Sequence, residues 1–395
     1  MHRGAFYLTN IKYHLQLVHI FAKIVTIMKV LRVDKNLIKT FVDFPDELYA
    51  GDDKYVPYMK GDLRKTLKKL LLEDKTYTAL LVVEGKAPLA RILLTVDKNK
   101  QLNTEKCGFF SMFECVDDQN VCNLLLDEAV KLLKAQGAEY VSGTYFPYDQ
   151  DNRRGILVDG FDRAPLIFTS YNKSYYNDLL TNYGLKKHTD ALEYKFDLDQ
   201  ITNYERVKRV AQYAERKFNF HVDTVQWSRI DSDIDDVHTV MEAATTEAIY
   251  QDAPSIEALK NIVKGWKNYL DKDYLLIARS NDTNEPLGVA IALPDYFQVF
   301  RKMRGRMDLR GLLVFVRERK RISAVRAILQ YVIPKYQAMG VAMAMYCKMF
   351  DAMLNNGITY LECGTMLEDN PQPNDAIKSV GGQLARRYRI YYKEI

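Results

Sequence analysis

Residues 332–346 read VIPKYQAMGVAMAMY, and this stretch decides how the second half of the chain is interpreted. An apolar run ends at Pro334, and the short segment after it has Gly340 as its single glycine. Apolar residues such as Met345 and Met349 then recur at helical spacing. The pattern predicts a strand that passes through a tight turn into a helix. Such a turn leaves the first backbone N–H groups of the helix without partners inside it.

Those N–H groups, together with the helix dipole, form an anion site when nothing negative or bulky blocks them. Gly340 allows the backbone to approach a ligand closely, Ala342 keeps the helix start narrow, and Gln337 either donates to the ligand or braces the turn. The nearest acids along the chain are Glu318 and Asp351, which lie well away from the turn. The stretch therefore predicts a site for a phosphate-bearing ligand, and a tight turn without a ligand is the alternative.

The matching place in the first half reads FECVDD, residues 113–118. It has no glycine, and Glu114, Asp117 and Asp118 lie at or just before the predicted helix start. Carboxylates at this position suit the helix dipole as caps, yet they would repel a pyrophosphate. We therefore predict that the second half binds a phosphorylated ligand and that the first half does not.

The chain reads as two copies of one unit. From Met28 on, the predicted order is a strand, helices, a two-stranded hairpin, a strand, a helix, a strand, a helix and a closing strand, and residues 201–395 repeat it with an insertion. Individual residues also match between the halves. Gly137-x-x-Tyr140 followed by Gly143-Thr144 corresponds to Gly357-x-x-Tyr360 followed by Gly364-Thr365, and Tyr183-Gly184 corresponds to Val380-Gly381. A chance match of element order is the alternative. The pattern predicts the α/β (α+β) class, each unit being a mixed, mostly antiparallel sheet flanked by helices.

Composition sets the remaining bounds. A length of 395 residues favours two domains, and the net charge of +5 is too small to argue for nucleic acid. The five cysteines show no CxxC spacing and the six histidines no ligand cluster, so we expect buried thiols in a reducing, cytoplasmic compartment and no metal. We divide the chain into residues 28–200 and 201–395, after a basic extension, residues 1–27, that we expect to be poorly ordered. A membrane-surface helix is the alternative for that extension.

The motif Gln337-x-x-Gly340-x-Ala342, after a strand and opening a helix, resembles the Q/R-x-x-G-x-G/A pyrophosphate loop of the GCN5-related N-acetyltransferase (GNAT) superfamily. From about Met28 the whole chain is similar to a bacterial family of paired acetyltransferase folds, the YghO-like proteins. The stretches that carry this second resemblance are GFFSMFE (108–114), GILVDGFD (155–162), Tyr175-Tyr176, LEDN (367–370) and YRIY (388–391).

The resemblance implies two tandem GNAT-like folds, of which the first is degenerate, and an acetyl-CoA or longer acyl-CoA donor. In that superfamily the fourth and fifth strands splay apart and pantetheine pairs with the fourth. The residues expected along the pantetheine are Gln330, Tyr331, Val332 and Ile333. Those expected around the pyrophosphate are Gln337, Ala338, Met339, Gly340, Val341 and Ala342. The implied reaction moves an acyl group from coenzyme A to a primary amine bound between the two domains.

Acyl transfer to an amine needs a base, because an alkyl ammonium is not nucleophilic at neutral pH. Glu362 within the fifth strand and Glu368 just past it are the candidates, with a salt bridge from Glu362 to Arg387 or Arg389 as the structural alternative. Asn370 is expected to position the substrate or to brace the turn. Many superfamily members carry a tyrosine acid in the following helix, but residues 374–380 have none, so Tyr388 on the last strand is the candidate substitute.

The segment 301–326 has ten Lys and Arg against two acids, with Leu312, Leu313, Val314, Phe315 and Val316 between them. As an insertion between the third and fourth strands it is expected at the cleft mouth. It is either a solvated basic face or a contact with the inner face of a membrane, which would suit a lipid amine acceptor such as that of bacterial ceramide synthesis. The loop with Tyr148, Asp151, Asn152, Arg153 and Arg154 is expected to wall the acceptor pocket. A non-catalytic acyl-CoA-binding protein and an aminoacyl-tRNA-dependent transferase are the alternative functions.

Overall fold

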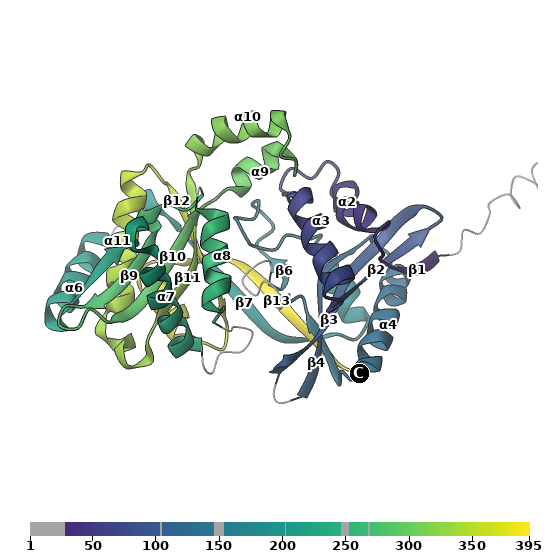
Figure 1. Cartoon of the computed structure of the whole chain (residues 1–395), viewed down its shortest axis with the longest axis horizontal. Helices are drawn as coiled ribbons and strands as arrows, with labels where there is room; N and C mark the ends of the chain where they lie inside the picture. Colours follow the sequence, from purple (N-terminus) through teal and green to yellow (C-terminus); the bar gives the residue numbers. More distant parts are fainter. Residues whose placement is uncertain (1–27, 103–104, 146–153, 202, 246–252, 268) are drawn as a thin grey trace, which may run out of the picture.

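The computed structural model describes residues 28–102, 105–145, 154–201, 203–245, 253–267 and 269–395. The extension 1–27 and, of the loop expected to wall an acceptor pocket, Tyr148, Asp151, Asn152 and Arg153 lie outside these residues. Figure 1 shows two lobes, one for each half of the chain, joined by long strands that run from one lobe into the other.

The first half contains the elements that the sequence predicts, plus one short strand, β6. In chain order they are β1 (Met28–Arg32), α2 (Ile38–Leu48), α3 (Lys60–Lys68) with a π-helical turn (Lys69–Glu73), β2 (Tyr77–Glu84), β3 (Ala87–Leu102), β4 (Glu105–Cys115), α4 (Gln119–Ala135), β5 (Tyr140–Gly143), β6 (Ile156–Asp159), α5 (Tyr176–Asn182) and β7 (Lys186–Asp197).

From β8 on, the second half repeats this order with an insertion and without a counterpart of β6, which confirms the predicted duplication of elements. Its elements are α6 (Tyr204–Lys217), β8 (Phe220–Thr224), α7 (Ile230–Thr245), α8 (Ile256–Trp266), β9 (Leu275–Ser280), β10 (Pro286–Pro294), α9 (Phe297–Met303), α10 (Leu309–Glu318), β11 (Ala324–Val332), α11 (Val341–Asn355), β12 (Tyr360–Leu367), α12 (Pro371–Ser379) and β13 (Gln383–Glu394). The predicted insertion is the pair α9 and α10, and α6 was not anticipated.

The described strands form one continuous sheet in the order β1-β2-β3-β4-β5-β13-β7-β12-β11-β10-β9-β8, with β6 beside β13. Within it, β4 pairs with β5 and β11 pairs with β12 in parallel, whereas the other pairings are antiparallel. The closing strands are exchanged, because β13 lies beside β5 of the first half and β7 lies beside β12 of the second. The exchange joins the two lobes through backbone hydrogen bonds.

The fourth and fifth strands of each half pair only where they begin. β11 pairs with β12 over Ala324–Ala327 and then runs on to Val332 without it. β4 and β5 pair over Cys107–Phe110 in the same way. Both fourth strands also shift register against the third strand, between Ile291 and Ala292 of β10 and between Arg91 and Leu93 of β3. Each half therefore opens a wedge between its fourth and fifth strands.

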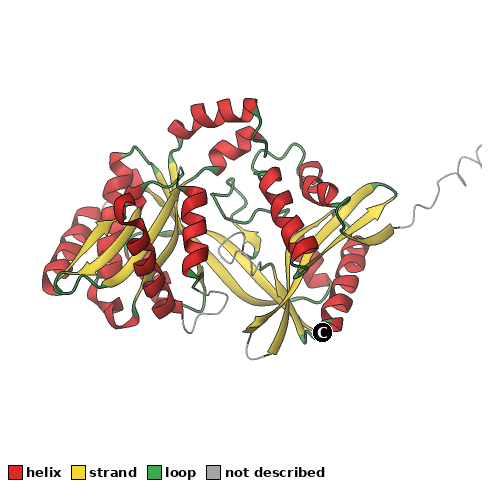
Figure 2. Cartoon of the chain, viewed as in Figure 1, coloured by secondary structure: helices red, strands yellow, loops and turns green. Residues whose placement is uncertain are grey.

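Helices cover both faces of the sheet (Figure 2). On one face of the second half, α6, α11 and α12 share a core with β8 to β12 that contains Met345, Met349 and Phe350. On the other face α7 packs over β9 and β10 through Val240, and α9 with α10 forms a separate cluster around Phe297 and Phe315. The wedge between β11 and β12 thus has helices on both sides.

Candidate functional site

The stretch 332–346 forms the predicted strand, turn and helix. β11 ends at Val332, a 3-10 turn covers Pro334–Met339, and α11 begins after Gly340, whose φ of 76° and ψ of 9° lie in the left-handed region that favours glycine. Gln337 Nε2 donates to the Val332 carbonyl at 3.3 Å, so this side chain braces the turn. Among the described residues, no side chain caps the start of α11. The helix start therefore keeps its backbone donors for another acceptor.

The corresponding place in the first half is closed. The Asp118 carboxylate caps α4 by accepting from the backbone N–H of Asn120 at 2.8 Å and of Val121 at 3.4 Å. Glu114 is buried, and its carboxylate accepts from the hydroxyls of Tyr49 and Tyr176, both at 2.8 Å. Burial raises the pKa of each tyrosine hydroxyl well above the ordinary value, and the Glu114 carboxylate adds to the shift. Both hydroxyls therefore stay protonated and donate to Glu114. The helix start of the first half is therefore capped by a carboxylate, whereas that of the second half is not.

A cavity of about 320 Å³ lies beside the open turn of the second half. Its outer part is lined by Gln337, Ala338, Gly340 and Ala342, of which Gln337 and Ala338 are exposed. Its inner part is lined by apolar side chains of α6, α11, α12 and the sheet, including Val207, Met343, Tyr346, Met349, Phe350, Met353, Leu361, Cys363 and Ile377. The cavity joins a set of backbone donors to an apolar interior, and its volume is near the lower end of the ~300–1,000 Å³ typical of small-molecule sites.

Helix α6 forms one wall of this cavity. The Tyr204 hydroxyl donates to Asp351 at 2.6 Å and to the Cys347 carbonyl at 2.9 Å, and Lys208 pairs with Asp351 at 2.7 Å. At the other end of α6, a Cβ added to Gly340 would lie 2.7 Å from the Ala214 Cβ. Gly340 is thus required twice, for its backbone conformation and for the close approach of α6.

The residues predicted to line the pantetheine divide between the two faces of β11. Val332 is buried in the core under α11, whereas Tyr331 and Ile333 pack on the α7 side. Gln330 lies on the α11 side by strand alternation, and its Oε1 is buried without a hydrogen-bond partner in the described part of the chain. A buried, unsatisfied amide oxygen at an open strand edge suits a polar ligand that supplies a donor.

Glu362 is fully buried in an ion network. Its carboxylate accepts from the Tyr360 hydroxyl at 2.6 Å and forms a short contact with Arg386, which also pairs with Glu193 at 3.4 Å. Arg326 binds the other oxygen of Glu193 at 3.0 Å. The salt-bridge alternative is thus realised, although its partner is Arg386, because Arg387 and Arg389 bind Asp190 on the other face of β13.

The network faces away from the cavity, since Leu361 and Cys363 on either side of Glu362 line that cavity. Burial and the nearby Glu193 carboxylate raise the pKa of Glu362 to about 8, while Arg386 acts in the opposite direction. Arg326 and Arg386 also donate to carbonyls of the first half, those of Ile167 at 3.2 Å and Ala164 at 2.8 Å. The network therefore lies where the two halves meet.

The other predicted catalytic residues fall into two places. The Tyr388 hydroxyl donates to Glu193 at 2.9 Å and so belongs to the network of Glu362. Glu368 lies past the end of β12, where it pairs with Lys187 at 2.6 Å. Asn370 is the exposed N-cap of α12, and its carbonyl accepts from Asn374 at 2.6 Å, so it braces that turn. The sequence analysis did not identify Glu193, Arg326 and Arg386 as site residues. The only feature that could have marked them is a charged residue within a strand of otherwise apolar residues.

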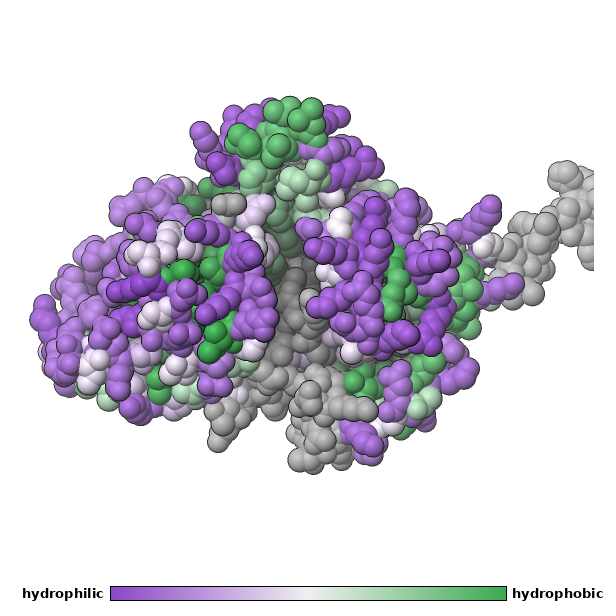
Figure 3. All heavy atoms as spheres, viewed as in Figure 1, coloured by the Kyte–Doolittle hydropathy of each residue, from purple (hydrophilic) through white to green (hydrophobic). Residues whose placement is uncertain are grey.

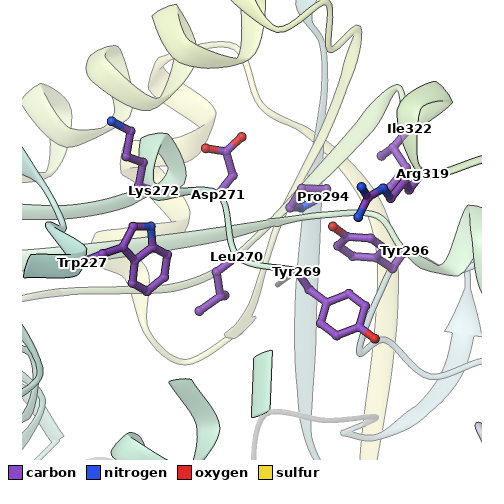
Figure 4. A pocket seen from close by; sticks show the side chains of 9 residues that line it. All are labelled: Trp227, Tyr269, Leu270, Asp271, Lys272, Pro294, Tyr296, Arg319 and Ile322. Atoms are coloured by element: carbon purple, nitrogen blue, oxygen red, sulfur yellow. The ribbon is translucent and has the colours of Figure 1, made fainter. Parts of the chain in front are cut away.

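A second, wide cavity of about 530 Å³ lies at the far end of β10. Figure 4 shows its lining, with the Arg319 side chain beside Tyr296 and the ring of Trp227 at the opposite end. Tyr269 and Tyr296 meet edge to face, with ring centroids 5.3 Å apart. Among the described residues no group of three or more His, Cys, Asp or Glu is placed to hold a metal ion. No helix of the described chain is both long and apolar enough to cross a membrane.

The fold and the wedge define the class of the protein, which has two tandem GNAT folds, as predicted. No family model matches the chain. It resembles the tandem GNAT protein of the clavulanic acid biosynthesis pathway, with a TM-score of 0.54 and 8% identity over 93% of this chain and 98% of that one. It also resembles the GCN5-related glucosamine N-acetyltransferase region of a fungal multi-domain beta-N-acetylglucosaminidase, with a TM-score of 0.58 and 13% identity. The match covers 93% of this chain and 38% of the fungal protein.

Two curated proteins are similar along nearly the whole sequence. Protein YghO of Escherichia coli is 22% identical over 373 residues, covering 92% of this chain and 94% of its own. The bacterial ceramide synthase of Caulobacter vibrioides is 23% identical over 376 residues, covering 91% and 95%. The predicted resemblance to YghO-like tandem GNAT proteins is thereby confirmed.

Proposed function

We propose that the chain is an acyl-CoA-dependent N-acyltransferase that moves an acyl group to a primary amine. The observation that carries the proposal is the cavity of the second half, in which an uncapped helix start opens into an apolar interior. A pyrophosphate suits the backbone N–H groups that follow Gly340, because the helix dipole favours negative charge there. The edge of β11 beyond Ala327, which β12 does not pair, suits the amides of pantetheine.

The apolar inner part of the cavity favours an acyl chain longer than acetyl. Met343, Met349 and Met353 are flexible, polarizable side chains that adapt to an alkyl chain. A lipid-type amine acceptor is supported by the relative named bacterial ceramide synthase, which matches this chain over nearly its whole length. We place the acceptor on the opposite face of the sheet, where Glu362 lies between the two halves.

In this proposal the amine nitrogen attacks the thioester carbonyl, the C–S bond breaks, and the thiolate leaves. The amine must first lose a proton, and Glu362 is the candidate acceptor because its pKa is raised to about 8, close to the working range of a general base. Glu368 is the other candidate, and its carboxylate is engaged by Lys187 at 2.6 Å and by the Asp190 N–H at 3.0 Å.

A non-catalytic acyl-CoA-binding protein is the second candidate. It is favoured by the engagement of Glu362 with Arg386 and Tyr360, which leaves that carboxylate poorly placed to take a proton from substrate. Turnover separates the two, because a sensor binds acyl-CoA and releases no thiol in the presence of any amine.

The test measures acyl-CoA binding by calorimetry and free-thiol release with a panel of amines that includes a long-chain amino alcohol. Ala338→Asp places a carboxylate on the exposed turn and should weaken binding, whereas Asn355→Asp places one on the exposed last residue of α11, at the other end of the helix, and should not. Absence of binding by the wild-type chain refutes the proposal, and binding without turnover favours the sensor.

A further inference from the structure

The outer face of α10 is apolar. Leu309, Leu312, Leu313 and Val316 are 78%, 48%, 67% and 50% exposed, and their spacing of three and four residues places them in one stripe along the helix. In Figure 3 the hydrophobic colour gathers at the top of the molecule, where α10 lies in Figure 1. An exposed stripe of this kind indicates an interaction surface rather than scattered surface residues.

The inner face of the same helix already has its partners. Phe315 is buried and stacks on Tyr296, with centroids 6.0 Å apart, and Glu318 is buried with ion pairs to Lys302 at 2.5 Å and Arg317 at 2.7 Å. The leucines of the outer stripe are therefore surplus to the packing of the lobe. A helix that is apolar on both faces needs a second apolar environment.

Positive charge surrounds the stripe. Arg304, Arg306, Arg310, Arg319 and Lys320 are all exposed on or next to α10. The two acids of this segment are used within it, because Glu318 is buried in ion pairs and Asp308 caps α10 by accepting from the Gly311 N–H at 2.8 Å. The surface thus combines an apolar stripe with a basic surround.

We propose that α10 docks the protein onto an anionic lipid bilayer, with the apolar stripe in the interfacial region and the basic side chains among the headgroups. A second copy of the chain fits less well, because a two-fold contact through this stripe would bring two sets of arginines together. Docking in this way places Arg319, which lines the cavity of Figure 4, next to the headgroups. The inference does not depend on acyl transfer, since it rests on the helix surface alone.

The test is flotation of the full chain with vesicles of phosphatidylcholine alone and of phosphatidylcholine with phosphatidylglycerol. We expect binding to the anionic vesicles that weakens at high salt and falls roughly tenfold or more in Leu312→Asp/Leu313→Asp. The matched control is Val210→Asp/Ile262→Asp, which adds two negative charges at apolar positions that are 47% and 51% exposed on α6 and α8. This control should bind like wild type. Arg310→Gln/Lys320→Gln changes the net charge by the same two units and shows how much of any loss comes from charge alone.

Three outcomes overturn the proposal. Wild-type chain that stays unbound with anionic vesicles removes the bilayer as the partner, and equal loss in both aspartate pairs assigns the effect to net charge instead of the stripe. A dimer in light scattering that Leu312→Asp/Leu313→Asp dissociates, without vesicle binding, makes the stripe a contact between copies. Thiol release with a water-soluble amine is measured in parallel, so that loss of docking is distinguished from loss of acyl transfer.

Discussion

Replacing Arg386 with methionine tests whether the ion network holds the two halves together. Arg386 is 2% exposed and contacts Glu193, Glu362 and the Ala164 carbonyl of the first half. Methionine fills much of the volume but leaves Glu362 without a cation and Glu193 with Arg326 alone. Removing one partner of a buried ion pair costs about 3–5 kcal/mol when the remaining charge is left uncompensated. Because the pKa of Glu362 is raised to about 8, we expect a loss of this size above pH 8 and a smaller loss at neutral pH, where the carboxyl takes up a proton.

The assay is urea unfolding followed by far-ultraviolet circular dichroism, and the control is Arg387→Met on the same strand. Arg387 pairs with Asp190 at 3.1 Å, but Arg389 holds both oxygens of that carboxylate, so we expect a loss of about 1 kcal/mol or less. Adding Glu362→Gln to Arg386→Met should recover part of the loss, with a coupling of roughly 0.5–3 kcal/mol. Equal destabilisation by the two arginine variants, or strict additivity in the double variant, would refute the reasoning.

Three further predictions concern the cavity and its surroundings. If Glu362 is the base, its ionised form is active, so kcat/KM should rise with pH up to about 8 and then level off. Glu362→Gln should lower kcat/KM by roughly 10²–10⁴-fold and remove this pH dependence. A pH profile that levels off near pH ~5 contradicts the assignment. Met343→Trp fills the inner cavity and should shift thiol release toward shorter acyl donors, whereas Leu354→Trp at an exposed position of the same helix should not; an unchanged chain-length profile places the acyl chain elsewhere. Asp118→Ala removes the cap of α4 and should cost about 0.5–2 kcal/mol of stability in urea unfolding, with acyl-CoA binding unchanged; altered binding would mean that the first half also contributes a donor site.

The duplicated order of elements was predictable because it is recorded in local signals. Gly137 and Gly357 both follow the helix after the fourth strand with φ of 85° and 71°, and Tyr140 and Tyr360 open the fifth strand of each half. Helix ends and turns depend on neighbouring residues, so a single sequence reports them. The contrast between the capped α4 and the uncapped α11 was readable for the same reason.

The long-range arrangement was not predictable from the sequence. Nothing local marks the exchange of β7 and β13, since each reads as an ordinary closing strand whichever half it joins. Helix α6 was missed although its local pattern is amphipathic, with Tyr204, Val207, Ala211 and Ala214 on the side that packs against the core and charged residues on the other. Glu193 and Arg386 lie 193 residues apart along the chain, so their pairing appears only in the folded sheet.

The strand exchange offers a physical reason for keeping a half whose helix start is capped by a carboxylate. Glu193 comes from β7, the closing strand of the first half; it accepts from the Tyr388 hydroxyl and shares Arg386 with Glu362, both of the second half. The carbonyls of Ala164 and Ile167, also from the first half, orient the two arginines that neutralise this pair of carboxylates. A second half on its own would therefore lack one carboxylate of the network and two acceptors of its arginines. We infer that the first half supports the surroundings of Glu362 instead of binding a donor itself, so substitutions at Ala164 or Ile167 that displace the backbone should alter the pH dependence of thiol release more than acyl-CoA binding.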